Sequence, residues 1–299
     1  MEIRRDAYLN ELIIRMHNGM IKVITGIRRC GKSYLMNSLF YRYLTESVTD
    51  DSHILRFAFD SADDLARIGE DPIELAREKR KVSPAKFMRF VSEQFPKEGT
   101  FYLLLDEIQE LDCFEAVLNG YLRNPQLEIY VTGSNSRFLS TDVLTEFEGR
   151  GDEIRIYPLS FAEFSSVYEG SLDEAWDDYM TYGGLPALTA MRTERQKIRY
   201  LESQLNNVYL KDIIIRNNLN HDTNLPELLG VLASGVATLV HPNILENTFR
   251  SEKKVKISAP TISQYMTFLQ EAFLINIVKR YDVKGKKYIN TPYKIYFED

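Results

Sequence analysis

An eight-residue stretch near the amino terminus has the spacing of a phosphate-binding loop. It reads GIRRCGKS from Gly26 to Ser33 and fits the pattern GxxxxGK[ST] without a mismatch. Glycines such as Gly31 let the main chain wrap so that its N–H groups converge on phosphate oxygens, and the following helix presents its positive end to the same anion. Lys32 can reach the β- and γ-phosphates, and the Ser33 hydroxyl can ligate Mg²⁺. The stretch therefore predicts a site for a nucleoside triphosphate with magnesium.

The residues inside and just after this loop belong to the expected nucleotide site, namely Ile27, Arg28, Arg29, Cys30 and Tyr34. Arg28 and Arg29 could contact phosphates or an acidic partner, or they could be solvated, and both interpretations stay open. Cys30 is interpreted as structural, although a thiol among phosphate-facing amides could have a lowered pKa.

A pair of carboxylates follows an apolar run from Phe101 to Leu105. Asp106 at the end of this expected strand would hold the magnesium shell, and Glu107 would orient and polarise the attacking water as general base. Two carboxylates favour hydrolysis over binding alone. The alternative is a strand that ends in a solvated acidic turn.

Two further groups of polar residues are candidates for catalysis. Ser134 and Asn135 follow the next expected strand and could sit between the water and the γ-phosphate, or they could form a turn with a helix cap. Arg150 lies between two glycines and suits an arginine finger, in cis or from a neighbouring subunit. A plain surface arginine is the alternative.

The elements that must position these residues alternate between strand and helix. The apolar runs expected to form strands are 21–25, 54–59, 101–105, 129–132 and 154–157. Helical patterns separate them, as at 32–45, 84–95 and 113–122. The alternation predicts an α/β fold with a mostly parallel sheet flanked by helices. The run at Phe101–Leu105 lacks alternation, as expected of a central strand buried on both faces.

The pattern changes after Pro158, and three domains are expected: 1–158 with the loop, a helical region at 159–242, and a third module at 243–299. A helix beginning near Ser258, an apolar run and a hairpin around Gly285 are typical of a winged helix. The 249–288 segment is rich in basic residues: Arg250, Lys253, Lys254, Lys256, Lys279, Arg280, Lys284, Lys286 and Lys287. This module could bind DNA, or it could act as a lid or protein contact.

Composition narrows the class of protein. The 299 residues carry a net charge of −6, so any nucleic-acid contact must be local. Two cysteines make no disulfide framework, and the four histidines have no metal-binding spacing. The amino terminus carries acids and has no apolar core typical of a signal peptide, and no run is long enough to span a bilayer. We therefore expect a cytoplasmic protein with no membrane contact.

Four motifs in order carry a family resemblance: GIRRCGKS, LLLDEIQ, VTGSNSRFLS and GRGDEIRIYPLSFAEF. They resemble the AAA-type ATPases of prokaryotes, in particular the archaeal-type ATPases related to the STAND signalling ATPases. The resemblance implies ATP as the nucleotide, a P-loop core, a small helical region and a winged helix. It also implies that Pro186, in the similar Gly-x-Pro motif, packs near the adenine. Family members commonly continue into a nuclease-like domain, whereas this sequence stops at Asp299, so we expect either that it is a fragment or that the nuclease-like domain is absent.

The leading hypothesis is an ATP-hydrolysing switch, with ATP and ADP as ligands and with a homo-oligomer or a protein as further partner. The alternative is a nucleotide-gated module that binds DNA or protein with little turnover. A small-molecule kinase would share the loop, but it is disfavoured by the adjacent pair Asp106 and Glu107, which suits water activation.

Overall fold

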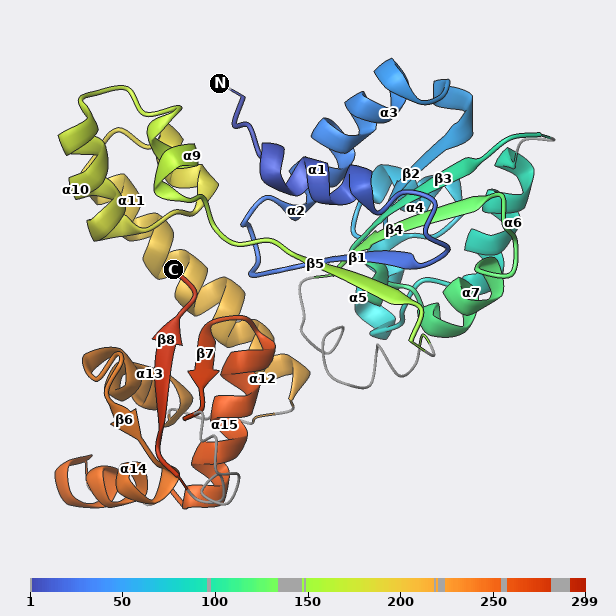
Figure 1. Cartoon of the computed structure of the whole chain (residues 1–299). Coiled ribbons are helices and arrows are strands. Elements are labelled where there is room, and N and C mark those ends of the chain that lie inside the picture. The colour runs from blue at the N-terminus through green and yellow to red at the C-terminus, as the bar shows by residue number, and fades with distance from the viewer. Residues whose placement is uncertain are drawn as a thin grey trace. The chain divides into compact units, whose positions relative to one another are not determined.

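The computed structural model describes residues 2–95, 98–133, 147, 149–217, 219, 224–253, 257–280 and 291–299. The chain divides into two compact units, Met1–Tyr157 and Pro158–Asp299 (Figure 1). The expected further division near Pro242 stays a prediction. No helix among the residues described is long and apolar enough to cross a membrane.

The first unit is built on a five-stranded sheet in which every neighbouring pair is parallel. Its order is β2-β3-β4-β1-β5. The strands are β1 (Ile21–Thr25), β2 (Ile54–Ala58), β3 (Phe101–Asp106), β4 (Leu127–Thr132) and β5 (Gly151–Arg155). The parallel α/β class predicted from the alternation of strand and helix is confirmed. Every residue of β1, β3 and β4 is buried, as the unbroken apolar run of β3 predicted.

Helices cover both faces of this sheet (Figure 1). They are α1 (Asp6–Ile14), α2 (Lys32–Tyr34), α3 (Tyr41–Ser47), α4 (Ala62–Arg67), α5 (Pro72–Glu78), α6 (Pro84–Gln94) and α7 (Phe114–Tyr121). On one face the rings of Phe57 and Phe59 in and after β2 pack against Phe87 of α6, with centroids 5.2 and 4.9 Å from it. On the other face Phe40 packs against Tyr130 of β4 at 4.6 Å. The sheet therefore forms the middle layer of three.

The helix after the phosphate loop differs from the regular helix expected at 32–45. Short α-helical pieces α2 and α3 flank a π-helical stretch at Leu35–Phe40. Extra residues per turn of this kind occur often beside functional sites. The stretch places Asn37 toward the end of β3, where its side-chain amide contacts Asp106.

The second unit is mainly helical and ends in a small sheet. Its helices are α9 (Phe161–Ser165), α10 (Leu172–Tyr182), α11 (Glu194–Ser203), α12 (Lys211–Arg216), α13 (Asn224–Ser234), α14 (Pro242–Thr248) and α15 (Ala259–Glu271). Capping boxes begin α9, α10 and α11, so serine or threonine and a glutamate or glutamine satisfy the first N–H groups. The strands β6 (Leu239–Val240), β7 (Ile275–Val278) and β8 (Tyr293–Phe297) pair antiparallel in the order β6-β8-β7.

The helix expected to begin near Ser258 is present as α15. The Ser258 side chain accepts the N–H of Thr261, and Pro260 lies in the first turn. Its buried residues are Ile262, Tyr265, Met266 and Leu269, which recur at helical spacing and therefore share one face. The hairpin expected around Gly285 lies outside the residues described.

Candidate functional site

The phosphate-loop motif forms a tight turn between β1 and α2. Gly26 has φ of 139° and Gly31 has φ of 103°, a region that side chains with a Cβ rarely adopt. A Cβ on Gly26 would also lie 2.1 Å from the carbonyl oxygen of Ile156, which follows β5. Both glycines are therefore required by the fold of the loop. The loop leads into the amino end of α2, where main-chain N–H groups attract an anion.

Lys32 folds back over its own loop. The side chain is buried, and its Nζ donates to the carbonyl oxygens of Gly26 at 3.0 Å and Ile27 at 3.1 Å. These two bonds keep the ammonium charge beside the main-chain amides of the turn. A cation and a set of N–H donors meet there, which is the combination that phosphate groups bind.

The residues inside the loop differ in exposure. Ile27 is buried, Arg28 is half-buried, and Arg29 and Tyr34 are exposed. Cys30 is fully buried, and burial raises the pKa of its thiol although positive charges nearby oppose the shift. The interpretation of Cys30 as structural fits this burial. The alternative of a lowered thiol pKa is wrong, because desolvation outweighs the charges.

Asp106 ends β3 and is brought into contact with the start of α2. Its Oδ2 accepts a hydrogen bond from Asn37 Nδ2 at 3.2 Å, its Oδ1 accepts one from the Thr132 hydroxyl, and the Ser33 hydroxyl lies close enough to act on its charge. Burial raises the pKa of Asp106, whereas these hydroxyl groups and the charge of Lys32 act to lower it. Ser33, Lys32 and Asp106 therefore lie together, although two come from the loop and one from a strand two places away in the sheet.

Glu107 follows directly and has a strained main chain. Its φ of 51° lies in the left-handed region, and its N–H donates to Thr132 Oγ1 at 3.0 Å. The side-chain amide of Gln109 donates to the Glu107 carboxylate. Strain of this kind is common at functional sites, where the surrounding contacts hold it in place.

Negative charge gathers around this pair of carboxylates. Burial raises the pKa of Asp60, and the charges of Glu107 and Asp106 raise it further. Burial also raises the pKa of Glu110, with Glu107 adding to the effect. The charge of Arg28 opposes both shifts, so this arginine of the loop lies toward the acidic residues. A cation bound here would relieve the mutual repulsion of the carboxylates.

Thr132 and Asn37 are functional candidates that the motifs did not reveal. Thr132 is the last residue of β4, and Asn37 lies in the π-helical stretch. The signal for Thr132 was a polar residue at the end of a buried strand, the same signal that pointed to Asp106. The residues chosen instead, Ser134 and Asn135, lie outside the residues described, so their roles stay predictions.

Arg150 is not brought to the phosphate loop. It comes just before β5, and its carbonyl oxygen accepts the N–H of Ile21 at the start of β1, at 2.9 Å. The loop follows the opposite end of β1, about 17 Å along a five-residue strand. The cis form of the arginine-finger hypothesis is therefore not supported by this placement. The exposed side chain of Arg150 leaves the trans form as a prediction.

The motif expected near the adenine lies in the second unit. Gly184 accepts the N–H of Leu159 at 2.8 Å and donates its own N–H to Asp299 Oδ1 at 2.6 Å. Burial raises the pKa of the Asp299 carboxyl, although N–H groups of this turn oppose the shift. Pro186 begins a short 3₁₀ helix directly afterwards and is half-buried. Contact between Pro186 and adenine stays a prediction.

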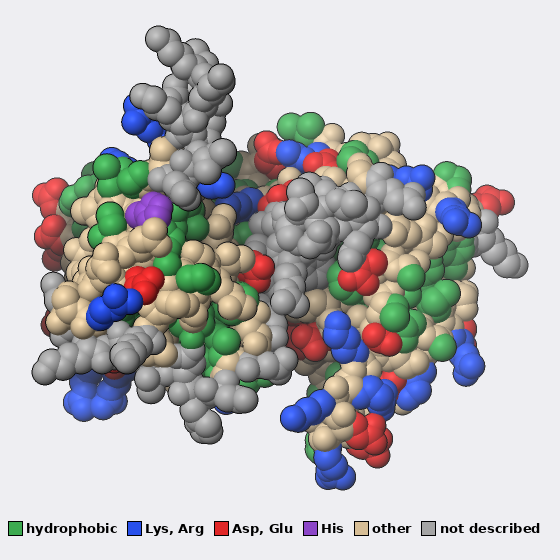
Figure 2. All heavy atoms as spheres, turned by 90° about the horizontal axis from the view of Figure 1, so that it is seen from below, with side chains coloured by type: hydrophobic (Ala, Val, Ile, Leu, Met, Phe, Trp, Pro, Cys, Tyr) green, Lys and Arg blue, Asp and Glu red, His purple; other side chains and the backbone are tan. Residues whose placement is uncertain are grey.

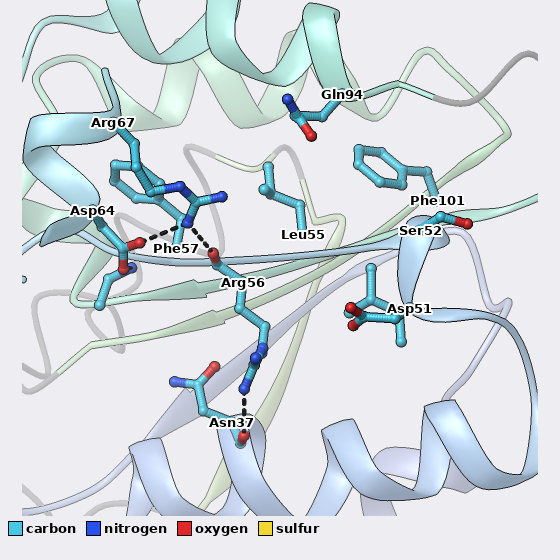
Figure 3. A pocket seen from close by; sticks show the side chains of 12 residues that line it. Asn37, Asp51, Ser52, Leu55, Arg56, Phe57, Asp64, Arg67, Gln94 and Phe101 are labelled. Atoms are coloured by element: carbon cyan, nitrogen blue, oxygen red, sulfur yellow. Dashed lines mark hydrogen bonds and ion pairs between the residues drawn. The ribbon is translucent and has the colours of Figure 1, made fainter. Parts of the chain in front are cut away.

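A separate hollow of about 500 Å³ lies beside the outer edge of β2 (Figure 3). Arg67 Nη1 donates to Asp64 Oδ1 at 2.7 Å and to the carbonyl oxygen of Arg56 at 3.5 Å, and Asp64 Oδ2 accepts the N–H of Ala58 at 2.9 Å. These side chains form hydrogen bonds with main-chain groups of the edge strand that could otherwise pair with another strand. Asn37 lines the hollow as well as contacting Asp106.

Comparisons with known proteins place this fold and site in a family. Residues 18–165 match the family model of an AAA domain, and residues 173–299 match a domain of unknown function. An uncharacterised protein of Haemophilus influenzae is 34% identical over 305 residues, which cover 99% of this chain and 72% of that protein. The chain belongs to the AAA-type P-loop ATPases.

Two more distant similarities extend this result. An uncharacterised protein of Methanocaldococcus jannaschii is 23% identical over 304 residues, 96% of this AAA-type ATPase and 63% of the relative. A solved structure, a Walker-type ATPase of Pyrococcus abyssi, has a TM-score of 0.65 and 16% identity, and the match covers 100% of this chain and 94% of that one. That similarity shows the fold.

Proposed function

We propose that this AAA-type ATPase binds ATP with Mg²⁺ in the loop between β1 and α2 and hydrolyses it. The observation that carries the proposal is that Ser33 and Lys32 of the loop both lie beside the Asp106 carboxylate at the end of β3 and act on its charge. A hydroxyl and a carboxylate oxygen are ligands that Mg²⁺ prefers, together with oxygens of the phosphates. The residues present therefore fit both the nucleotide and the ion.

Each part of the site has a proposed role in binding. The N–H groups of the Gly26–Ser33 loop surround the β-phosphate, and Lys32 exchanges its bonds to the Gly26 and Ile27 carbonyls for bonds to phosphate oxygens. Ser33 and Asp106 hold the magnesium ion, which neutralises charge on the phosphates. Asn37 and Thr132 keep the Asp106 carboxylate in one orientation.

Glu107 is the proposed general base. The oxygen of the attacking water bonds to the γ-phosphorus, and its proton goes to the Glu107 carboxylate. The bond from the γ-phosphorus to the bridging oxygen breaks, and ADP and phosphate leave. The hydrogen bonds of Thr132 to the Glu107 main chain and of Gln109 to its carboxylate support this role, because they hold the base in position.

The test is the variant Glu107→Gln. We expect ATP binding close to that of the wild type and phosphate release lowered by about 10²- to 10⁴-fold, since only proton transfer is lost. Glu110→Gln is the matched control, because Glu110 is a second glutamate in the same acidic surroundings. Turnover of Glu107→Gln at the wild-type rate would mean that another group takes the proton.

A second candidate function is favoured by the topology of the second unit. We infer that the succession α13, β6, α14, α15, β7 and β8, with sheet order β6-β8-β7, is a winged helix. Its helix α15 turns Ser263, Gln264 and Thr267 to solvent, which are side chains suited to base edges and phosphates. A hollow of about 520 Å³ beside them is lined by Lys279, among others. The candidate function is a nucleotide-gated module that binds duplex DNA.

Salt dependence tests this second function. If α15 and Lys279 meet DNA, the affinity for a labelled duplex falls steeply with salt, by a slope of about 0.9 per phosphate contact on a log–log plot. Lys279→Ala should lower that slope by about one, whereas Lys211→Ala on the exposed surface of α12 should leave it unchanged. On the face in Figure 2, basic and acidic side chains are interspersed. An affinity for the duplex that does not change with salt concentration would exclude DNA binding and would favour a protein partner.

A further inference from the structure

Arg5 makes a buried bridge that includes the phosphate loop. It precedes α1 and is 3% exposed. Its Nη1 donates to the carbonyl oxygen of Cys30 at 3.0 Å, and its Nη2 donates to that of Tyr157 at 2.7 Å. One guanidinium therefore connects three segments of the first unit: the amino-terminal segment, the loop, and the chain after β5.

The surroundings of Arg5 hold its guanidinium in place. The Cζ atom lies 4.6 Å from the ring centroid of Tyr8, a distance typical of a cation–π contact. The Tyr8 hydroxyl accepts the N–H of Tyr157 at 3.3 Å. Arg5 and Tyr8 together thus fasten the first turn of α1 to the chain that leaves β5.

The bond to Cys30 determines where the next N–H group points. The peptide bond between Cys30 and Gly31 is planar and trans, so its C=O and N–H point in opposite directions. With the Cys30 carbonyl turned toward Arg5, the Gly31 N–H is turned away from Arg5 at the amino end of α2. A charged donor on the carbonyl also polarises the peptide and strengthens its N–H as a donor.

We propose that Arg5 is a positioning residue of the nucleotide site, which holds the Gly31 N–H in the direction of the β-phosphate. This inference rests on the proposed function, because it requires a phosphate in the loop. Arg5 acts through the main chain and does not contact the reacting atoms. It therefore contributes to nucleotide affinity and not to the transfer of the proton.

Only an arginine fits this role. Its planar fork donates to two carbonyl oxygens at once, whereas a lysine ammonium is a point charge on a flexible stem. Lysine at position 5 would keep the positive charge but lose the simultaneous bond to Cys30 and Tyr157. Charge alone and the two-carbonyl bridge can therefore be separated by substitution.

The experiment measures the Kd of ADP and of ATPγS, and the kcat and KM for ATP, in the full chain. We expect Arg5→Ala to raise both Kd and KM by about tenfold or more, with kcat at saturating ATP close to the wild type. Arg5→Lys should recover only a small part of the loss. Ethylguanidinium, at concentrations that leave the wild-type melting temperature unchanged, should restore binding to Arg5→Ala. Arg4→Ala is the matched control, because Arg4 is the exposed neighbour in the sequence.

The possible outcomes separate this inference from the function on which it rests. Nucleotide binding by the wild type and its loss in Lys32→Ala establish the site independently of Arg5. If Arg5→Ala then binds as tightly as the wild type, or if Arg5→Lys is fully active, the bridge has no positioning role. A fall in kcat without a rise in KM would also overturn it. Should Arg5→Ala fail to fold, Arg5→Lys alone decides between these results, and absent binding by the wild type would remove both proposals.

Discussion

At the scale of single residues, the site is organised around one carboxylate that several elements hold. Asp106 accepts hydrogen bonds from Asn37 of the π-helical stretch and Thr132 of β4, and Ser33 of α2 lies beside it. Thr132 also accepts the main-chain N–H of Glu107, so one hydroxyl holds both acidic residues. We expect the orientation of the carboxylates to depend on Thr132 more than on any residue of the loop.

Thr132→Val tests this dependence. The variant removes the hydroxyl and leaves a buried carboxylate oxygen and the Glu107 N–H without this partner, which costs about 1–3 kcal/mol. We expect the free energy of unfolding in urea to fall by about that amount, and phosphate release to fall with it. Thr45→Val is the control, because the Thr45 hydroxyl bonds only to carbonyls of its own helix. An equal loss of unfolding free energy and of phosphate release in both variants would contradict a special role for Thr132.

At the scale of elements, the order of the sheet brings the site together. β4 lies between β3 and β1, so Asp106 at the end of β3 and the loop after β1 face each other across the end of β4. The positions of the flanking helices depend on buried polar contacts as well as on apolar packing. The clearest is Glu70, whose side chain is 1% exposed and which accepts the N–H of Ser83, the residue before α6, at 3.2 Å.

Glu70→Gln should destabilise the protein in a pH-dependent way. Burial acts to raise the pKa of Glu70, but hydrogen bonds from Lys86 and Ser83 and the charge of Arg80 lower it below its ordinary value of 4.5. A lowered pKa stabilises the folded state above the ordinary pKa, and this stabilisation is lost as the pH falls through the folded-state pKa. We expect a loss of about 1–3 kcal/mol in the free energy of unfolding at pH 7, shrinking in acid.

The control for this prediction is Glu78→Gln. Glu78 pairs with the same Arg80 at 3.0 Å, but its side chain is 58% exposed. An exposed ion pair contributes little to stability, so the free energy of unfolding of this variant should stay close to that of the wild type at every pH. A pH-independent loss in Glu70→Gln would show that packing, and not charge, is what Glu70 contributes.

Local spacing explains which parts of the site were predictable from the sequence. Lys32 lies in a motif of eight residues, and Asp106 ends a conspicuous apolar run, so both could be found without knowing the fold. Thr132 and Asn37 bond to Asp106, which is 26 and 69 positions away in the chain. Arg5 bonds to carbonyl oxygens 25 and 152 positions away. Contacts between residues so far apart in the chain depend on the strand order of the sheet. The spacing of neighbouring residues in the sequence carries no information about that order.

The same limit applies to whole elements. The strands and the parallel class followed from hydrophobic pattern, whereas the order β2-β3-β4-β1-β5 did not. The interpretation of Arg150 as a finger in cis is not supported for this reason: its position between glycines looked suitable, but the sequence did not show at which end of the sheet Arg150 lies. The π-helical stretch at Leu35–Phe40 was expected to be regular helix, since its residues have no distinctive pattern.

At the scale of the whole molecule, the chain combines an ATPase unit with a second unit of a different kind. The second unit matches a domain of unknown function, and a winged helix within it is our proposal. The chain covers 72% and 63% of the lengths of the two relatives compared, so the activity and partners of the complete proteins are matters for experiment. Arg150 is exposed and lies away from the phosphate loop of its own chain, so it could act only on the nucleotide site of a neighbouring subunit in an oligomer.

If Arg150 completes the site of a neighbouring subunit, two inactive variants should rescue each other. Arg150→Ala and Glu107→Gln each lose activity alone, by about a thousandfold for a missing finger. A mixed assembly contains sites with both Arg150 and Glu107 intact, so phosphate release should recover on mixing. Arg123→Ala, at an exposed arginine before β4, is the control and should stay active. Mixtures no more active than their components would contradict the trans hypothesis.

The central claim is that the loop between β1 and α2 encloses a triphosphate beside a magnesium ion held by Asp106. Calorimetric titration of ATPγS into the wild type, Lys32→Ala, Asp106→Asn and the exposed-lysine control Lys211→Ala, with and without Mg²⁺, tests it most directly. We predict tight binding to the wild type and to Lys211→Ala, none detectable to Lys32→Ala, and binding to Asp106→Asn that Mg²⁺ no longer strengthens. Wild-type affinity in Lys32→Ala, or an unchanged magnesium effect in Asp106→Asn, would contradict the account.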